Sequence, residues 1–252
     1  MTAVTGALAG RVVLVTGAHG GLGTAASRAC ARAGATLVLL GRKVRQLERL
    51  HDAIAADPGA TAPVLYPLDL EGATPDDFAE LAQRIEDAYG RLDGLLHCTA
   101  EFRGLTPLEH TDPAHFARAL HVGVTAPWWL TQACLPVLRK SEDASIVFVV
   151  DDPNLVSKAY WGGYGVGQHG LSALVGMLHA ELPAEGPVRV AGLQPGPMRT
   201  ALRAKAFVDD QDREARDPAF AAEACVGLLS AAGATHRGTI VSRDTVTGGQ
   251  AA

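Results

Sequence analysis

"RVVLVTGAHGGLG" (residues 11–23) decides the fold, because it joins a short apolar run to a glycine-rich turn. Its first six residues are mostly β-branched or aliphatic and end at Gly17, which is typical of a buried strand. The turn then opens a helical pattern over 21–34. Gly17, Gly21 and Gly23 would let the backbone turn tightly and approach a pyrophosphate at the helix N-terminus. Such a turn alone could be a tight loop without a ligand, but its place between a first strand and a first helix favours a dinucleotide site.

The rest of the chain repeats this alternation of strand and helix. We predict further strands at 35–41, 62–70, 92–98, 145–150, 187–195 and 238–242, and further helices at 43–56, 75–90, 112–139, 162–182 and 219–232. Strands that are apolar on both faces and alternate with helices predict a parallel sheet covered on both sides. No repeat, low-complexity tract or proline-rich linker divides the chain, so we predict a single domain over 1–252. Ligands of such sheets bind at the C-terminal ends of the strands.

Composition narrows the range of functions. The chain has 252 residues, 48% hydrophobic and 19% charged, with a formal net charge of −5. This balance is typical of a soluble globular protein and argues against nucleic acid as a partner. We see neither a membrane-spanning run nor a signal peptide, and we expect a cytoplasmic protein with no membrane contact. Cys30, Cys98, Cys134 and Cys225 lie far apart without a CxxC pair, so we predict free buried thiols and no bound metal.

The end of the second strand indicates which dinucleotide is preferred. An acidic residue there would bind the ribose 2′-hydroxyl of NAD, but this chain has Arg42 and Lys43. Two cations suit a 2′-phosphate, so we expect NADP(H) rather than NAD(H); a solvated, basic helix start is the alternative. His19 could add a weaker phosphate contact. Asp69 could accept a hydrogen bond from the adenine amino group, or could simply cap the next segment.

Together these features resemble the short-chain dehydrogenase/reductase family over nearly the whole chain. The resemblance rests on the TGxxxGxG turn, on Asp69-Leu70, on Tyr164 after the fifth strand and on "QPGPMRT" (194–200). "LLGRK" and "PMRTALRAKAF" make the chain look most like the YciK-type bacterial oxidoreductases within that family. The resemblance implies a Rossmann-type, doubly wound α/β fold with a parallel seven-stranded sheet. It also implies a homotetramer or dimer, with the two longest helices packed between subunits.

The resemblance also implies further cofactor-binding positions in the loops after the strands. In addition to the residues named above, they are Leu22, Leu70, Thr99, Ala100, Pro195, Gly196 and Thr200. The Asn-Ala-Gly stretch usual after strand four is replaced by Cys98-Thr99-Ala100. Because that stretch normally brings bare backbone close to the cofactor, Ala100 in place of glycine could crowd the site.

Three of the four catalytic positions of the family are replaced in this chain. The tyrosine is present as Tyr164, but the lysine four residues later falls on Gln168. The serine that usually lies about 13 residues before the tyrosine falls on Asp151, and the asparagine of the long helix falls near Gly123.

These replacements should impair proton transfer by Tyr164. The missing lysine would lower the pKa of the phenol, whereas Gln168 lies on the same helix face and carries no charge. Its amide could still reach the ribose hydroxyls. A carboxylate at Asp151 disfavours the phenolate and cannot donate a hydrogen bond to a carbonyl oxygen unless it is protonated. We therefore expect ordinary carbonyl reduction or alcohol oxidation to be strongly impaired.

Other residues could rescue the chemistry. Lys158 could swing in, His121 lies near the asparagine-equivalent position, and a buried Asp151 could stay protonated and act as an acid. Lys158 also fits a solvated loop, and His97 fits a hydrogen-bonded core position. The polar segment 199–218 is a candidate lid or an exposed loop.

Two classes of function remain open. The first is an NADP(H)-binding protein without efficient redox chemistry, acting as a pseudoenzyme, a sensor or a partner subunit for an unknown small molecule. The second is an active NADP(H)-dependent oxidoreductase with an altered proton relay around Tyr164, Asp151 and His121. Non-redox chemistry in the same pocket has no specific support in the sequence.

Overall fold

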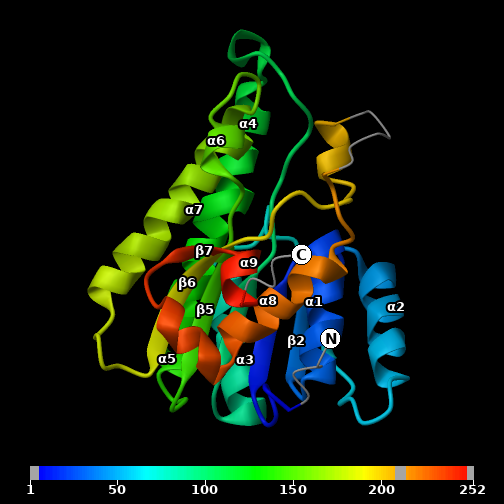
Figure 1. The fold of residues 1–252 in the computed structure, drawn as a ribbon, viewed down its shortest axis with the longest axis vertical. Helices are drawn as coiled ribbons and strands as arrows, with labels where there is room; N and C mark the ends of the chain where they lie inside the picture. Colours follow the sequence, from blue (N-terminus) through cyan, green and yellow to red (C-terminus); the bar gives the residue numbers. More distant parts are fainter. Residues whose placement is uncertain (1–5, 208–213, 249–252) are drawn as a thin grey trace.

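A computed structural model describes residues 6–207 and 214–248 and has a single seven-stranded sheet at its centre (Figure 1). All neighbouring strands are parallel, in the order β3-β2-β1-β4-β5-β6-β7. The strands are β1 (Val12–Thr16), β2 (Thr36–Gly41), β3 (Val64–Pro67), β4 (Gly94–His97), β5 (Ala144–Val149), β6 (Val188–Gln194) and β7 (Ile240–Ser242). The doubly wound α/β fold predicted from the sequence is confirmed.

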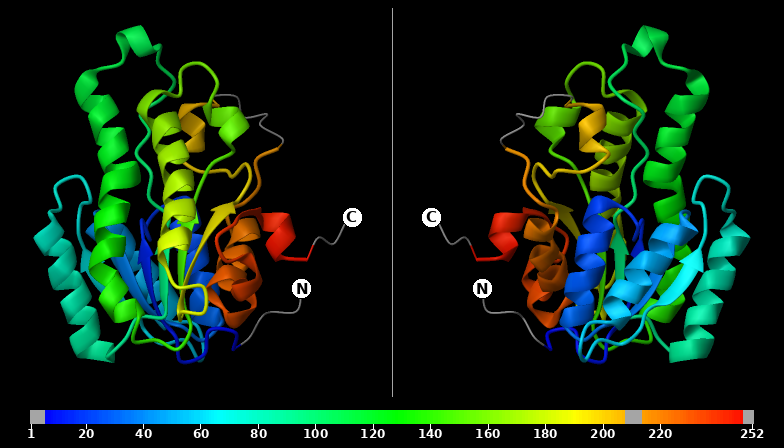
Figure 2. Two further views of the ribbon diagram at one scale, coloured as in Figure 1. Left: turned by 90° about the vertical axis from the view of Figure 1, so that its left-hand side faces the viewer. Right: turned by 90° about the vertical axis from the view of Figure 1, so that its right-hand side faces the viewer.

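Helices cover both faces of this sheet (Figure 2). They are α1 (Gly21–Arg32), α2 (Val44–Ala55), α3 (Pro75–Tyr89), α4 (Pro113–Leu120), α5 (Ala126–Leu138), α6 (Pro153–Val156), α7 (Gly162–Glu181), α8 (Ala219–Leu229) and α9 (Arg243–Val246). Apolar side chains of α1, α2 and α8 form one core layer with the sheet, and those of α3, α5 and α7 form the other. The strands are buried on both faces because both layers are filled, as the apolar runs predict.

The order of the strands reverses between β1 and β4, which are neighbours although β2 and β3 intervene in the sequence. At such a reversal the connections leave in opposite directions and open a crevice above the C-terminal strand ends. Helix α4, the short helix α6 and the N-terminal part of α7 rise beyond this edge (Figure 1). Of these three helices, α7 supplies residues to a cavity at this edge.

The predicted long helix at 112–139 is one helical stretch with an interruption. A π-helical segment, His121–Thr125, separates α4 from α5. Pro127 explains it, because proline has no N–H to give to the carbonyl four residues earlier, and its ring would clash with that carbonyl. Widening of the turn relieves this conflict, and such π-segments often occur at functional sites. The carbonyl in question belongs to Gly123.

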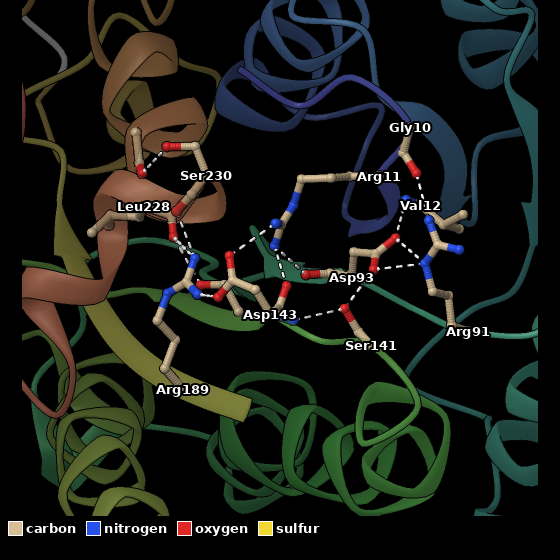
Figure 3. A network of polar contacts seen from close by, with 12 residues as sticks. Gly10, Arg11, Val12, Arg91, Asp93, Ser141, Asp143, Arg189, Leu228 and Ser230 are labelled. Atoms are coloured by element: carbon tan, nitrogen blue, oxygen red, sulfur yellow. Dashed lines mark hydrogen bonds and ion pairs between the residues drawn. The ribbon is translucent and has the colours of Figure 1, made fainter. Parts of the chain in front are cut away.

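A polar network ties together the opposite, N-terminal edge of the sheet (Figure 3). Arg11, before β1, donates to Asp143 Oδ2 over 2.9 Å and to the carbonyl of Asp93 over 3.1 Å. Arg189 of β6 is 2% exposed, forms an ion pair with Asp143 and donates to the carbonyl of Ser230 over 2.6 Å. The network links four strands and α8, far from the crevice.

Several element boundaries differ from the sequence-based expectation. Strand β3 covers only 64–67 of the predicted 62–70, and β7 covers 240–242 of the predicted 238–242. The short helix α6, which is capped by Asp152, was not predicted. The four cysteines are free, and Cys30, Cys134 and Cys225 are buried, as predicted. Among the described residues, none of the helices is both long and apolar enough to cross a membrane.

Candidate functional site

A cavity of about 290 Å³ lies over the C-terminal ends of the strands. Most of the residues predicted to form the site line it. They are Gly17, His19, Gly21, Leu22, Arg42, Asp69, Leu70, Thr99, Ala100, Asp151, Tyr164, Gln168, Pro195, Gly196 and Thr200. The structure therefore brings the glycine-rich turn and the tyrosine together in one cleft, although they are far apart in the sequence.

The backbone of the glycine-rich turn lies so close to neighbouring atoms that a side chain at Gly17 or Gly23 would not fit. Gly17 has a φ of +61°, and a Cβ placed on it would lie 2.9 Å from Cγ2 of Thr99. A Cβ on Gly23 would lie 2.2 Å from the carbonyl oxygen of Gly17. Helix α1 begins at Gly21 with no side-chain cap, so its first N–H groups remain for a ligand. This cradle fits the pyrophosphate of a dinucleotide.

Arg42 lies where a 2′-phosphate would be recognised, but it has carboxylates beside it. Its guanidinium lies 3.7 Å from Asp69 and 3.6 Å from Glu101. Both separations exceed an ordinary hydrogen bond, so these are loose ion pairs that a phosphate could replace. Sequence reasoning missed Glu101, which follows β4 and lines the cavity. Its acidic charge after a strand end was the signal that could have identified it.

His19 lies close to Arg42 and Lys43, and its surroundings favour the neutral imidazole. Burial lowers the pKa of its imidazole, and the nearby charges of Lys43 and Arg42 lower it further. Its Nδ1 atom is buried and has no hydrogen-bond partner among the described residues. A buried polar atom without a partner is costly unless a ligand or water satisfies it. Because this atom is enclosed beside Gly41, it does not bear on the predicted contact between His19 and a bound cofactor, which stays a prediction.

Tyr164, Asp151 and Gln168 form a connected group at the other end of the cavity. The Tyr164 hydroxyl donates to Oδ2 of Asp151 over 2.8 Å. The backbone N–H of Asp151 donates to Oε1 of Gln168 over 2.8 Å. The amide nitrogen of Gln168, which can only donate, is thereby turned away from that N–H.

The surroundings of Tyr164 hold it in the neutral form. The pKa of its phenol is raised well above the ordinary value, first by burial, then by the charge of Asp151 and by the hydrogen bond to it. Each of these favours the protonated phenol over the phenolate. The Gln168 side chain cannot offset them because it carries no charge.

Aromatic rings line the cavity next to this group. Trp161 and Tyr164 line it with their ring centroids 5.6 Å apart. Phe102 does not line the cavity but packs on Trp161, with centroids 5.2 Å apart. Phe207 lies 6.4 Å from Trp161 and adds a further ring. Trp161 is 7% exposed and lines the cavity.

Some predicted residues are not brought to the cavity. Gly23, Lys43, Gly123 and His121 do not line it, although Val122 beside Gly123 does. The His121 ring instead packs edge-on against Trp129, with centroids 5.4 Å apart. Gly123 is buried in the π-segment, and a Cβ built on it would meet nothing within 4 Å. A larger residue therefore has room there.

Two of the possible rescue groups are also held elsewhere. Lys158 is exposed and does not line the cavity. His97 is buried, as predicted, with its Nε2 3.0 Å from Oγ1 of Thr131 and its ring stacked on Phe148. Among the described residues, no cluster of histidine, cysteine, aspartate or glutamate could hold a metal ion.

The candidate lid at 199–218 is described at both ends, while 208–213 lie outside the described residues. Its first part supplies Thr200 and Phe207 to the cavity. Its two ends are tied together, because Arg199 N–H donates to the Arg216 carbonyl over 2.8 Å. Its opening and closing remain a prediction.

Comparison with known proteins agrees with this geometry. The family model described as short chain dehydrogenase matches residues 11–211. The uncharacterised oxidoreductase YciK of Escherichia coli K12 is 35% identical over 209 residues, 83% of this chain and 82% of that protein. A short chain dehydrogenase structure from Shigella flexneri 2a, complexed with NADP, superposes with a TM-score of 0.90 at 32% identity, covering 95% of this chain and 99% of that one. Another, from Escherichia coli CFT073 with NADPH, gives a TM-score of 0.89 at 33% identity, covering 94% and 98%.

Proposed function

The chain belongs to the short chain dehydrogenase family, and from that membership we propose that it binds NADP(H) but is impaired in conventional carbonyl or alcohol chemistry. The family assignment supplies the expectation of a nicotinamide cofactor. The side chains around Tyr164 supply the reason to expect altered chemistry.

Binding of NADP(H) is supported by features of the chain and of its relatives. The glycine cradle at Gly17 and Gly23 fits a pyrophosphate, and Arg42, Lys43 and His19 gather at the end of β2, where a 2′-phosphate would lie. Two similar structures, each about one third identical, contain NADP and NADPH. When bound, the reduced cofactor supplies a hydride, and the chain's own residues must then position the acceptor and control its proton.

The hydrogen bond from Tyr164 to Asp151 carries the proposal of impaired chemistry. A carbonyl oxygen that receives a hydride must also receive a proton, and Tyr164 would have to release that proton from a raised pKa. In this structure its hydroxyl is already engaged with the carboxylate. Gln168 can hold the loop at Asp151 and offer an amide, but it cannot stabilise a phenolate by charge.

An active oxidoreductase with an altered relay is the alternative. The same 2.8 Å hydrogen bond favours it, since a proton could pass between Tyr164 and Asp151 and reach a ligand in the cavity. Retention of Tyr164 in the cavity wall also fits this alternative. The two proposals differ in whether turnover follows binding.

Calorimetry followed by rapid kinetics separates them. NADP⁺, NADPH and NAD⁺ are titrated into the protein, and NADPH oxidation is then followed by stopped flow with ketones and 3-oxoacyl thioesters. We expect NADP(H) to bind more tightly than NAD⁺, without rapid turnover. Robust turnover with any of these substrates would overturn the impaired chemistry and favour the alternative. Absence of any dinucleotide binding would overturn the cofactor assignment.

We also propose that the chain forms a dimer or tetramer through its longest helices. Val166 and Met177 of α7 are 52% and 58% exposed, and Trp128 of α5 is 43% exposed. Large apolar side chains exposed on neighbouring helices are typical of subunit contacts. Light scattering after gel filtration tests this, and a monomer at micromolar concentration would contradict it. A cytoplasmic location remains a prediction.

A further inference from the structure

Asp151 differs from the other carboxylates of the cavity in having no cation beside it. Asp69 and Glu101 both lie next to Arg42. Among the ion pairs of the described residues, none includes Asp151. Its Oδ1 accepts from the N–H of Asp152 over 2.8 Å, and its Oδ2 accepts from Tyr164. Since each carboxylate oxygen can accept two hydrogen bonds, Asp151 keeps acceptor positions for a ligand.

The walls beside Asp151 are aromatic. Trp161 and Tyr164 line the cavity and are 7% and 8% exposed, with ring centroids 5.6 Å apart. Phe102, which does not line this cavity, packs against both rings, with centroids 5.2 Å from Trp161 and 5.1 Å from Tyr164. Aromatic ring faces attract cations, most strongly where water is excluded. A carboxylate next to such rings is the combination that recognises a positively charged nitrogen.

We infer that this end of the cavity binds a small organic cation, a protonated imine or amine, with Asp151 as its counter-ion. The inference rests on the proposed function, because it names the ligand class of the same cavity. A neutral ketone is a poor match, since a carboxylate only accepts hydrogen bonds and the Tyr164 hydroxyl is engaged with it. An N–H⁺ group instead donates to the carboxylate in a charge-assisted hydrogen bond.

Reduction of a protonated imine also requires no proton from Tyr164. If a reduced nicotinamide cofactor gives a hydride to its carbon and is itself oxidised, the electron pair of the C=N bond moves onto nitrogen and cancels the positive charge. The product is a neutral amine, and no proton has to leave the phenol. The raised pKa of Tyr164, which obstructs carbonyl reduction, is therefore no obstacle to a ligand of this class.

Two cations of the segment at 199–218 have contacts of their own. Lys205 Nζ donates to the carbonyl of Phe102 over 2.5 Å. The guanidinium of Arg203 lies over the Phe207 ring, 4.0 Å from its centroid. Both belong to the segment that covers the cavity. The positive charges of Arg203 and Lys205 favour an anion near this segment and disfavour a cation there. The organic cation is therefore placed at Asp151.

Calorimetry with a matched pair of probes tests the inference. The probes are 3,4-dihydroisoquinoline, a cyclic imine that takes up a proton near neutral pH, and 1-tetralone, a neutral ketone of similar size. Each is titrated at pH 7 into the protein alone and into protein with saturating NADP⁺. We expect the imine to bind roughly ten-fold or more tightly than the ketone, because only the imine makes a charge-assisted hydrogen bond.

Variants assign this preference to Asp151. Asp151→Asn keeps the shape and removes the charge, and we expect it to abolish the preference. Asp152→Asn is the matched control, because Asp152 is the exposed neighbour that caps α6 and asparagine is an equally good cap. Circular dichroism checks that each variant is folded.

The outcomes separate this inference from the proposed function. Equal binding of the two probes, absence of binding by both, or a preference that survives in Asp151→Asn would overturn the inference, even where NADP(H) binds. If NADP(H) fails to bind, the proposed function fails, while the titrations without cofactor still decide the inference.

Discussion

The Tyr164 hydroxyl donates a hydrogen bond to Oδ2 of Asp151, 2.8 Å away, and both residues line the same cavity. A donor that is needed for proton transfer is thus bound to a carboxylate of the same site. The bond and the charge both stabilise the neutral phenol.

Removal of the Asp151 charge should make Tyr164 easier to ionise. In Asp151→Asn, we expect the pKa of the phenol to fall, because the negative charge that opposes the phenolate is gone. Its pKa should stay above the ordinary value, since burial is the larger cause of the rise. Ultraviolet difference titration measures tyrosinate, and Tyr164→Phe identifies which signal is lost. An unchanged titration would show that Asp151 does not act on the phenol.

Restoration of the family residues should restore conventional chemistry. In Asp151→Ser with Gln168→Lys, the carboxylate is replaced by a hydroxyl and an ammonium joins the helix face of Tyr164. Both changes favour the phenolate, so we expect NADPH-dependent ketone reduction to rise by roughly a hundred-fold or more. Gly123→Asn can be added, because a Cβ there meets nothing within 4 Å. Stopped-flow kinetics of the double variant, the triple variant and the parent measures the gain. No gain in a folded, NADPH-binding variant would place the defect elsewhere.

Arg42 should set the preference for the 2′-phosphate. In Arg42→Ala, we expect NADPH to bind roughly ten- to a hundred-fold more weakly while NADH changes little, because only NADPH carries the phosphate that the guanidinium would bind. Arg45→Ala is the control, since Arg45 is an exposed cation on α2 that does not line the cavity. Equal losses for both dinucleotides, or for both variants, would contradict a specific phosphate contact. Calorimetry measures both affinities.

Most of the fold and part of the site could be predicted from the sequence. The apolar runs and the glycine-rich turn predicted the parallel sheet, because buried strands and tight turns need those residues wherever they occur. Helix α7 was predicted within one residue, since its pattern ends at Leu182-Pro183. The π-segment at 121–125 was missed, although Pro127 in the helical run was a visible signal of a conflict.

Contacts between distant side chains could not be predicted from local patterns. The loose pairing of Arg42 with Glu101 depends on how two strand ends face each other across the cavity. The packing of His121 on Trp129, away from the cavity, depends on the helix rotation through the π-segment. Only the resemblance to a known family predicts from the sequence that Asp151 and Tyr164 lie close together.

The network at the N-terminal edge of the sheet should contribute strongly to stability. Arg189 is almost fully buried and its pKa is lowered to about 10, chiefly by burial. Asp143→Asn leaves this charge without its carboxylate, and we expect a loss of about 3 kcal/mol in the free energy of unfolding. Arg189→Met combined with Asp143→Asn should recover part of it, because the Arg189 charge is then no longer buried without its carboxylate, while Arg11 loses its contact with Asp143 in both variants. Urea unfolding of the single and double variants measures this coupling, and additive losses would exclude it.

His97 should make the protein less stable in acid. Thr131 donates its hydroxyl proton to the Pro127 carbonyl over 2.7 Å, so His97 Nε2 must carry the proton of their shared hydrogen bond. Its Nδ1 is then a buried acceptor without a described partner, and burial lowers the pKa of the ring from 6.5 to about 3.

Between these two pKa values the unfolded chain binds a proton at His97 that the folded chain does not. Stability attributable to His97 is therefore complete above pH 6.5 and falls as the pH drops toward 3, by up to about 1.4 kcal/mol per pH unit. In His97→Gln, which can still donate to Thr131 but does not titrate, we expect a shallower loss of stability over this range. Urea unfolding at several pH values from 7 to 4 measures both slopes. Equal slopes for parent and variant would mean that the buried ring is not the group that takes up the proton on unfolding.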